Sequence, residues 1–521
     1  MKSKTREALH RIAMFVMAIG LVLSAQAVTN LGVGAAAQGG GVLLIGYDLS
    51  SSINPIAFDP AQFNGPAGFF SYNWPIYAGL LRETTSGGYV PDLASAVTVP
   101  NPSTIDITIR PGLTYSNGTP LDAAAVKAGY ERNLSNPHPG AWNTATYDIS
   151  TIDVTGTDTL VMSFSQPVAS AFYPLLADQE SFMALPTGSS TGSANTKVVG
   201  AGPFMLKSYT QGQRIVLVKN PKYWDAESIK LAGITFTNVP VGPQQINALE
   251  AGTSEVEVNL PASDIPTLKA LPQLQASTSF PDANYLFAPI CKLKGPLEDL
   301  RVRQALNFAT NRKAINSSLL FGKGQPAWSI FPSTSVFYDK SLTDYYAYNL
   351  KKAKHLMAQA GYPNGFSTTL MALPLTATTQ LAQVLQEEWK QIGVNVRIVQ
   401  TSNYVTDLYR DNKAQIGLNP QGLPGIQKIT TSYITNTVGD LCNYDNPILD
   451  ALTKEIEALP PGSPQLKSAW TQVQQVIITN ALSVYVDYSP LVTGASKKVK
   501  NLQVIPYVGG VLNYWVVSLS S

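Results

Sequence analysis

The chain has 521 residues, with 36 Lys and Arg, 34 Asp and Glu, 3 His and 2 Cys. Its formal charge is only +2 at pH 7. Nucleic-acid binding usually requires a strongly basic surface stripe, so we expect no nucleic-acid partner. Two cysteines are too few for a disulfide-dense scaffold or a cysteine-based zinc module. A chain of this length predicts two or three domains.

The N-terminus has the features of a secretory signal peptide. Four basic residues precede an apolar run over 12–23, and the small residues Ala25-Gln26-Ala27 follow it. The run is shorter than the roughly 20 residues that a membrane span prefers. We therefore expect 1–37 to be a signal peptide and small-residue linker, cleaved after Ala27 or Ala37, and the mature chain to be periplasmic or extracellular. An uncleaved membrane tether stays an alternative, but no cysteine follows the run, which excludes a lipoprotein.

Short strands are expected in the first third of the mature chain. The apolar run 42–47 suits a buried strand, and the alternation in 104–110 suits a half-buried one. Asp122 is the expected N-cap of a helix over 123–134, and further strands are expected in 153–164. This part of the chain is therefore mixed and rich in strands.

Helices become frequent after residue 299, beyond a polar boundary at 187–197. Asp299, Asn311 and Asn349 are the expected N-caps of three successive helices. Helices that alternate with strands indicate an α/β lobe. The other elements expected after the boundary are helices 447–459 and 465–479 and strands 204–209, 214–219, 394–399, 483–488 and 515–518.

Groups that could carry catalysis are scarce. Beyond the export signal only His138, in a loop, and His355, on a lysine-rich helix, remain, and both suit solvated surface positions. No G-x-S-x-G, H-E-x-x-H or Walker motif occurs. We expect no enzyme, no metal site and no cofactor, although the dispersed carboxylates of a secreted hydrolase stay open. The 24 Tyr, 7 Trp and 17 Phe favour uncharged recognition of a small ligand.

The two cysteines, Cys291 and Cys442, leave two alternatives open. Export would permit a disulfide between them, and two buried free thiols are equally consistent with the sequence. A redox-catalytic pair is excluded because the spacing is not C-x-x-C.

Six motifs follow one another in an order that is specific. They are Tyr77-Ala78-Gly79-Leu80-Leu81 with Pro91-Asp92-Leu93-Ala94, Arg110-Pro111-Gly112 with Ser116-Asn117-Gly118-Thr119-Pro120, Gly202-Pro203-Phe204, Asn220-Pro221-Lys222-Tyr223-Trp224, Asp299-Leu300-Arg301-Val302-Arg303-Gln304-Ala305-Leu306, and the helix from Ala353 to Tyr362. Together they resemble the extracellular solute-binding proteins of family 5, the dipeptide-, oligopeptide- and nickel-binding components of ABC importers. Turns, caps and ion pairs explain the motif residues locally, with Arg301 and Arg303 expected to pair with carboxylates or carbonyls. The resemblance therefore identifies the scaffold without naming the ligand.

The resemblance implies a two-lobed α/β fold of the periplasmic-binding-protein type (type II, cluster C), with an extra α+β domain inserted in lobe I. The resemblance implies a monomer that encloses a small-molecule or peptide-like ligand between its lobes and delivers it to a membrane permease. A sensor or chaperone-like module on the same scaffold is the alternative. The implied domains are lobe I at 41–70, 194–286 and 487–521, the inserted domain at 71–193, and lobe II at 287–486.

The sequence departs from the peptide binders of this family in one place. Their W-x-x-D segment, whose Asp takes the ammonium group of the ligand, corresponds here to 416–425, which has neither Trp nor Asp. Free-amine peptides are therefore disfavoured, unless Asp440 or Asp445 supplies the charge. Tyr285 also suits a plain core strand. The residues expected to line the ligand site are Ser50, Ser51, Ser52, Trp74, Tyr285, Trp328, Tyr404, Gly422, Leu423 and Tyr444.

Overall fold

The computed structural model divides the chain into the units Met1–Gly40 and Gly41–Ser521, and all described elements belong to the second. The structure describes residues 40–49, 58–60, 68–85, 88–135, 149–178, 181, 183, 185, 198–280, 285–291, 293–404, 406–421, 433, 446–505 and 511–520. The expected export signal and the boundary at 187–197 lie outside these residues. Among them, no helix is both long and apolar enough to cross a membrane.

A seven-stranded sheet combines three distant parts of the chain. Its order is β12-β19-β11-β1-β10-β9-β8, and β1 runs parallel to β10 and β11. Helices α6 (Pro243–Ala251) and α7 (Ile265–Ala270) pack on its strands. The strands are β1 (Val42–Tyr47), β8 (Phe204–Thr210), β9 (Arg214–Lys219), β10 (Gly233–Asn238), β11 (Val256–Leu260), β12 (Leu274–Ser279) and β19 (Leu491–Ser496).

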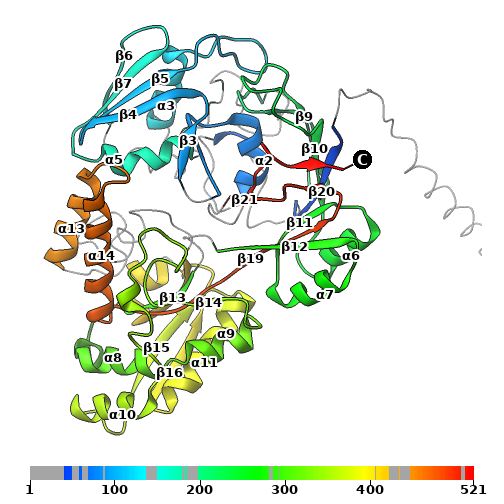
Figure 1. The fold of residues 1–521 in the computed structure, drawn as a ribbon. Coiled ribbons are helices and arrows are strands. Elements are labelled where there is room, and N and C mark those ends of the chain that lie inside the picture. The colour runs from blue at the N-terminus through cyan, green and yellow to red at the C-terminus, as the bar shows by residue number, and fades with distance from the viewer. Residues whose placement is uncertain are drawn as a thin grey trace, which may run out of the picture. The chain divides into compact units, whose positions relative to one another are not determined.

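A four-stranded antiparallel sheet lies between β1 and β8 in the sequence, in the order β4-β5-β7-β6. Helix α3 (Ala123–Ser135) packs on it (Figure 1), as does α5 (Ala169–Phe172). The alternation in the sequence is matched by alternating burial along β5. The strands are β4 (Ala94–Asn101), β5 (Thr104–Ile109), β6 (Ile149–Val154) and β7 (Thr159–Phe164).

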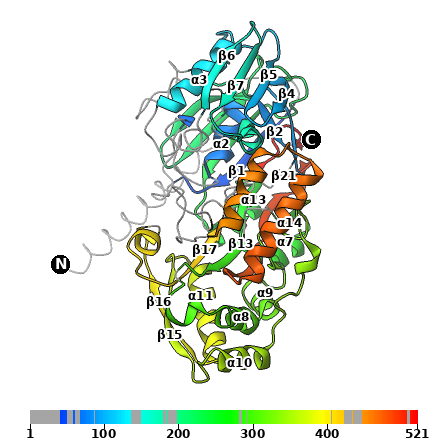
Figure 2. The ribbon, with the colours of Figure 1, turned by 90° about the vertical axis from the view of Figure 1, so that its left-hand side faces the viewer.

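A six-stranded mixed sheet forms the helix-rich part, in the order β14-β18-β13-β17-β15-β16. Figure 2 shows α13 (Pro447–Ala458) and α14 (Pro464–Thr479), which pack against each other. The strands are β13 (Tyr285–Pro289), β14 (Gln325–Pro326), β15 (Phe366–Ala372), β16 (Val394–Gln400), β17 (Ile416–Gln421) and β18 (Ser483–Tyr488), and the other long helices are α8 (Leu300–Ala309), α9 (Arg312–Leu319), α10 (Leu350–Gln359) and α11 (Thr376–Lys390).

The chain crosses between the seven- and six-stranded sheets twice. It leaves the first between β12 and β13 and returns between β18 and β19. The domain boundaries implied by the resemblance stay predictions. The shorter elements are α2 (Gly68–Tyr77), β2 (Leu81–Glu83), β3 (Tyr89–Pro91), β20 (Val499–Lys500), β21 (Val504–Ile505), β22 (Val511–Leu512) and β23 (Ser518–Leu519).

The expected helix caps are confirmed. Asp122 Oδ1 accepts a hydrogen bond from Ala125 N at 2.9 Å, and Asp299 Oδ1 accepts one from Arg301 N at 2.8 Å. The side chains of Asn311 and Asn349 cap α9 and α10 in the same way. Each cap satisfies an amide that the first helical turn leaves without a partner.

The expected strand at 515–518 is wrong at its start, because Trp515 lies in a turn and only Ser518–Leu519 is extended. Tyr514 and Trp515 are consecutive, yet both are buried. The Tyr514 hydroxyl donates to Ser71 O at 2.7 Å, and Trp515 Nε1 donates to Tyr223 Oη at 2.9 Å. In a strand, neighbouring side chains point to opposite faces. The turn allows the consecutive side chains of Tyr514 and Trp515 both to be buried.

Candidate functional site

Asp92 joins three of the sequence motifs. Its Oδ1 accepts hydrogen bonds from the Tyr223 hydroxyl at 2.7 Å and from Trp224 Nε1 at 2.8 Å. Arg110 Nε donates to Asp92 O at 2.6 Å, and its guanidinium lies 3.7 Å from the centre of the Trp224 ring. Burial raises the pKa of Asp92, and Arg82 and the two donors oppose this rise. These motif residues therefore fasten the region of the four-stranded sheet to the chain that follows β9.

Arg301 and Arg303 also have structural partners, as expected. Arg301 forms an ion pair with Asp299 at 2.5 Å and donates to Gln359 O at 2.7 Å. The buried Arg303 donates to Leu297 O at 2.9 Å and to Asn480 O at 3.0 Å. Both residues connect element ends, so they determine the fold and leave the ligand unspecified.

Trp74 and Tyr404, two of the expected lining residues, are packed in the interior. The Trp74 side chain on α2 is 1% exposed, and its ring meets that of Trp515 edge-on at 5.9 Å. Tyr404 is 3% exposed and lies against Gly417 of β17, where a Cβ would come within 2.3 Å of the Tyr404 hydroxyl. The structure gives both residues a packing role, and their contact with ligand stays a prediction.

Tyr285 belongs to an aromatic cluster on the neighbouring strands β13 and β18. Its ring lies 5.8 Å from that of Tyr485 and 5.6 Å from that of Tyr488. The buried Tyr433 hydroxyl forms hydrogen bonds with the Tyr485 hydroxyl at 2.8 Å and with Ser483 Oγ at 2.5 Å. Burial raises the pKa of Tyr285 well above its ordinary value. Tyr285 is therefore packed in the core in this structure, as the alternative drawn from the sequence has it, and its contact with ligand stays a prediction.

Trp328 is the expected lining residue that the structure leaves half-buried. The guanidinium of Arg312 lies 5.2 Å from the centre of its ring. Arg312 is itself held by carbonyls, donating to Tyr485 O at 2.6 Å and to Ala327 O at 3.1 Å. Burial lowers the pKa of Arg312 to about 10. Arg312 thus holds one side of the Trp328 ring in place beside β14 and β18, and part of the Trp328 side chain stays exposed to solvent.

Several expected site residues lie outside the described residues, so nothing follows about their placement. They are Ser50, Ser51, Ser52, Gly422, Leu423 and Tyr444, together with Asp440, Asp445 and His138. His355 is exposed on α10, as expected. Cys291 is disulfide-bonded, and Cys442, also outside the described residues, is the only other cysteine in the sequence.

Sequence reasoning missed Asp487, a buried acid on β18. Its side chain is fully buried, and burial raises its pKa to about 9. The signal was present in the sequence Val484-Tyr485-Val486-Asp487-Tyr488, where a single acid interrupts an apolar and aromatic strand. An acid at such a position requires a physical reason, because burying a carboxylate is unfavourable.

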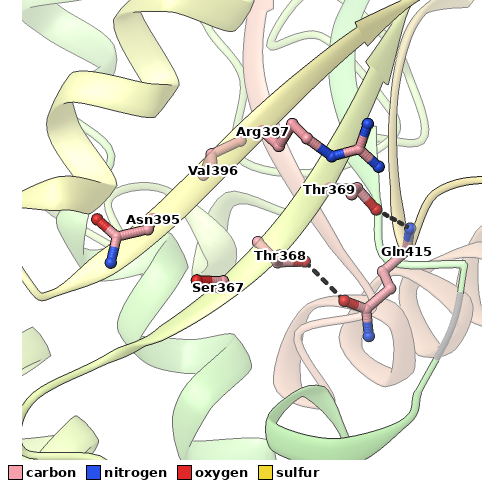
Figure 3. Close-up of a pocket in the computed structure, with 7 residues that line it drawn as sticks. All are labelled: Ser367, Thr368, Thr369, Asn395, Val396, Arg397 and Gln415. Carbon is pink, nitrogen blue, oxygen red and sulfur yellow. Dashed lines mark hydrogen bonds between the residues drawn. The ribbon is translucent and has the colours of Figure 1, made fainter.

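A pocket of about 410 Å³ lies on β15 and β16 and is lined also by Gln415, which precedes β17. Figure 3 shows Thr368 and Thr369 turned toward Gln415; Thr368 Oγ1 donates to Gln415 Oε1 at 2.9 Å, and Gln415 N donates to Thr369 Oγ1 at 3.1 Å. Ligands of open α/β sheets bind at the carboxyl ends of the strands, whereas these residues are near the amino ends.

Among the described residues, no group of three His, Cys, Asp or Glu side chains is placed to hold a metal ion.

The sheets and their two crossings define a two-lobed α/β fold. The solved structure of the ABC transporter-associated periplasmic binding protein DppA from Helicobacter pylori, in complex with the peptide STSA, covers 93% of this chain and 99% of its own, with a TM-score of 0.75 and 20% identity. This likeness establishes the fold.

The family follows from the sequence comparison. The profile of bacterial extracellular solute-binding proteins, family 5, matches residues 88–428, and the chain belongs to this family. The glutathione-binding protein GsiB of Salmonella paratyphi A is 31% identical over 300 residues, which are 57% of each chain. The heme-binding protein A of Haemophilus influenzae is 26% identical over 325 residues, 60% of this chain and 58% of the relative. The matches thus span little more than half the length of these relatives.

Proposed function

We propose that this chain is the exported substrate-binding protein of an ABC importer. It captures a peptide-like or other organic solute by closure of its two lobes and delivers it to a membrane permease. The observation that carries this proposal is the family match over residues 88–428, on a fold whose two main sheets are joined by two crossings. Hinge closure of such lobes links occupancy to a shape that a permease can recognise.

The comparisons name several classes of solute for related proteins and do not select one for this chain. The names of the relatives mention glutathione and heme, and the DppA structure holds a peptide, so the scaffold accepts different solutes. The segment at 416–425 lacks the Trp and Asp of the peptide binders. A solute recognised through backbone hydrogen bonds and aromatic packing fits this segment, with Trp328 as a half-buried aromatic platform.

We propose that the protein binds its solute without changing it. The buried acids Asp92 and Glu257 have structural hydrogen-bond donors, Tyr223 with Trp224 for the first and Ser254 for the second. Neither is therefore held ready as a general acid or base. The mature protein is proposed to act as a monomer outside the cytoplasm, after removal of the N-terminal segment at 1–37.

Native mass spectrometry of the purified mature protein, followed by calorimetry with a panel of peptides, glutathione, heme and saccharides, tests the proposal. We expect one class to bind with a dissociation constant of about 1 μM or lower. The Trp328→Ala variant is expected to bind that solute at least about fivefold more weakly, which is about 1 kcal/mol. Tyr348→Ala, which removes an exposed aromatic ring from another loop, serves as the matched control and is expected to bind normally. Failure of every class to bind would refute the proposed function.

A further inference from the structure

Strands β15 and β16 carry polar side chains on a face that parallel strands normally bury. Their register pairs Ser367 with Asn395 and Thr369 with Arg397, so these four side chains share one face of the sheet. Helix α11 packs against β16, and Val396, which points to the opposite face, is 7% exposed. Parallel strands are usually covered on both faces and apolar throughout. The polar face of this pair departs from that arrangement.

This polar face is open to solvent. Ser367, Asn395 and Arg397 are exposed, and Thr369 is half-buried. Strand β16 ends the six-stranded sheet, so among the described strands it has a neighbour on one side alone. The four side chains line the pocket of about 410 Å³, together with Gln415. A ligand therefore reaches the pocket from solvent without displacing any part of the chain.

Gln415 forms a fixed wall of the pocket. Its Oε1 accepts a hydrogen bond from Thr368 Oγ1 at 2.9 Å, and its Nε2 donates to Lys294 O at 3.3 Å. Its backbone amide donates to Thr369 Oγ1 at 3.1 Å, so the Thr369 hydroxyl is oriented by a bond that leaves its own proton unused. Figure 3 shows the Arg397 side chain extending from β16 toward Thr369 and Gln415.

The pocket offers a surplus of hydrogen-bond donors. A guanidinium has several N–H donors and no acceptor, and Arg397 has no hydrogen bond or ion pair with any part of the chain that the structure describes. The exposed Ser367 hydroxyl and Asn395 amide are unpaired in the same part of the chain. The hydroxyl proton of Thr369 adds a further donor. Such a set fits a ligand that is anionic and rich in oxygen.

The charge of the pocket is a single positive one. Arg397 is the one charged residue among those that line it. The acids that precede Gln415 in the chain, Asp407 and Asp411, both pair with Lys413, at 2.6 and 3.4 Å. A carboxylate carries one negative charge and matches the planar guanidinium with two parallel hydrogen bonds. A phosphate monoester carries about −1.5 to −2 at pH 7, which one arginine does not balance.

We propose that this pocket is an accessory binding site for a sugar acid, a hexuronate that is either free or part of an acidic polysaccharide. The Arg397 guanidinium binds the carboxylate, and Ser367, Thr369 and Asn395 form hydrogen bonds with the ring hydroxyl groups. Hydroxyl and amide side chains both donate and accept, as sugar hydroxyls require. The volume of about 410 Å³ lies within the range of about 300–1,000 Å³ that is usual for small-molecule sites.

The test uses the full mature protein and three matched probes in ligand-observed NMR titrations. D-Galacturonate has both the ring and the carboxylate, D-galactose has the ring alone, and acetate has the carboxylate alone. We expect a dissociation constant of about 1 mM or lower for galacturonate, and constants at least about tenfold higher for galactose and acetate. An exposed arginine without a pocket would bind acetate and galacturonate equally.

Three variants locate the binding. Arg397→Gln is expected to bind galacturonate at least about tenfold more weakly, and Asn395→Ala at least about threefold more weakly. Arg214→Gln is the matched control, because it removes another exposed strand arginine, on β9 of the seven-stranded sheet, and is expected to bind normally. All three positions are exposed, so the variants are expected to unfold in urea as the wild type does.

Four results would overturn the inference. They are no galacturonate binding up to about 10 mM, galactose or acetate binding as tightly as galacturonate, glucose 6-phosphate binding more tightly than galacturonate, and unchanged galacturonate binding in Arg397→Gln. The last would show that the sugar binds elsewhere in the protein. The solute of the proposed function is expected to bind normally to Arg397→Gln, so the two proposals can fail separately.

Trigalacturonate distinguishes the two sources of the sugar acid. Binding at least about threefold tighter than that of the monosaccharide supports a residue within a polysaccharide. Equal binding supports a free sugar acid. Both results agree with the same site, because the carboxylate and the ring hydroxyl groups are common to the two ligands.

Discussion

The buried acid on β18 makes the stability of the unliganded protein depend on pH. Below about pH 3.8 both the folded and the unfolded chain hold the proton of Asp487, so it has no effect. Between 3.8 and about 9 the unfolded chain releases the proton while the folded chain keeps it. The folded state binds more protons in this window, so its stability falls as the pH rises.

The magnitude follows from the size of the shift. Each unit of pKa difference corresponds to about 1.4 kcal/mol, so the penalty reaches about 4 kcal/mol at pH 7. Asp487→Asn has no proton to hold and escapes the pH-dependent part of this penalty. We therefore expect the difference in unfolding free energy, variant minus wild type, to increase by about 4 kcal/mol between pH 4 and pH 7.

Urea unfolding followed by tryptophan fluorescence at several pH values measures this difference. The comparison with the variant at each pH isolates Asp487 from Glu257, Glu388 and Glu457, whose pKa values burial also raises to about 7. A difference that stays constant over the whole range would refute the reasoning, because it would show that Asp487 ionises in the folded chain as it does in the unfolded chain.

Three further predictions concern other buried groups. Glu257→Gln is expected to add up to about 3 kcal/mol of stability above pH 8 and little at pH 4, because burial raises the pKa of Glu257 from 4.5 to about 7; equal stabilisation at both pH values in urea titrations would contradict this. Tyr433→Phe removes hydrogen bonds to Ser483 and Tyr485 and is expected to lower the unfolding free energy by about 1–2 kcal/mol, with Tyr348→Phe as an exposed control that shows no change. The Cys291→Ser/Cys442→Ser double variant is expected to lose about 2–5 kcal/mol, and dithiothreitol should lower the melting temperature of the wild type but not of this variant.

Local chemistry explains which elements could be predicted. Asp299 and Asn349 begin helices because each cap acts on amides two or three residues away, a relation that the sequence displays directly. Trp515 shows the opposite case, since its turn depends on Tyr223 and Trp74, far away in the chain. Nothing in the sequence around Trp515 signals those partners.

The candidate site was harder to predict than the fold for the same reason. Trp74 and Tyr285 have the residue types of a ligand platform, and only their neighbours in space reveal that both are packed against other rings. Asp487 was visible as an anomaly within an apolar strand, yet its neighbours Gly324 and the backbone amide of Gln325 belong to a distant segment of the chain. The family motifs identified the scaffold because they fasten it, and the residues that choose a solute are not part of those motifs.

The contacts of Asp92 with Arg110, Tyr223 and Trp224 limit how chimaeras of this family can be built. A graft that exchanged only the region of the four-stranded sheet would bring its own acid and arginine but keep the tyrosine and tryptophan of the recipient. Such a hybrid keeps these hydrogen bonds only when both parents have the same geometry at the contacts of Asp92. Recombination breakpoints are therefore best placed so that 92, 110 and 223–224 are inherited from one parent.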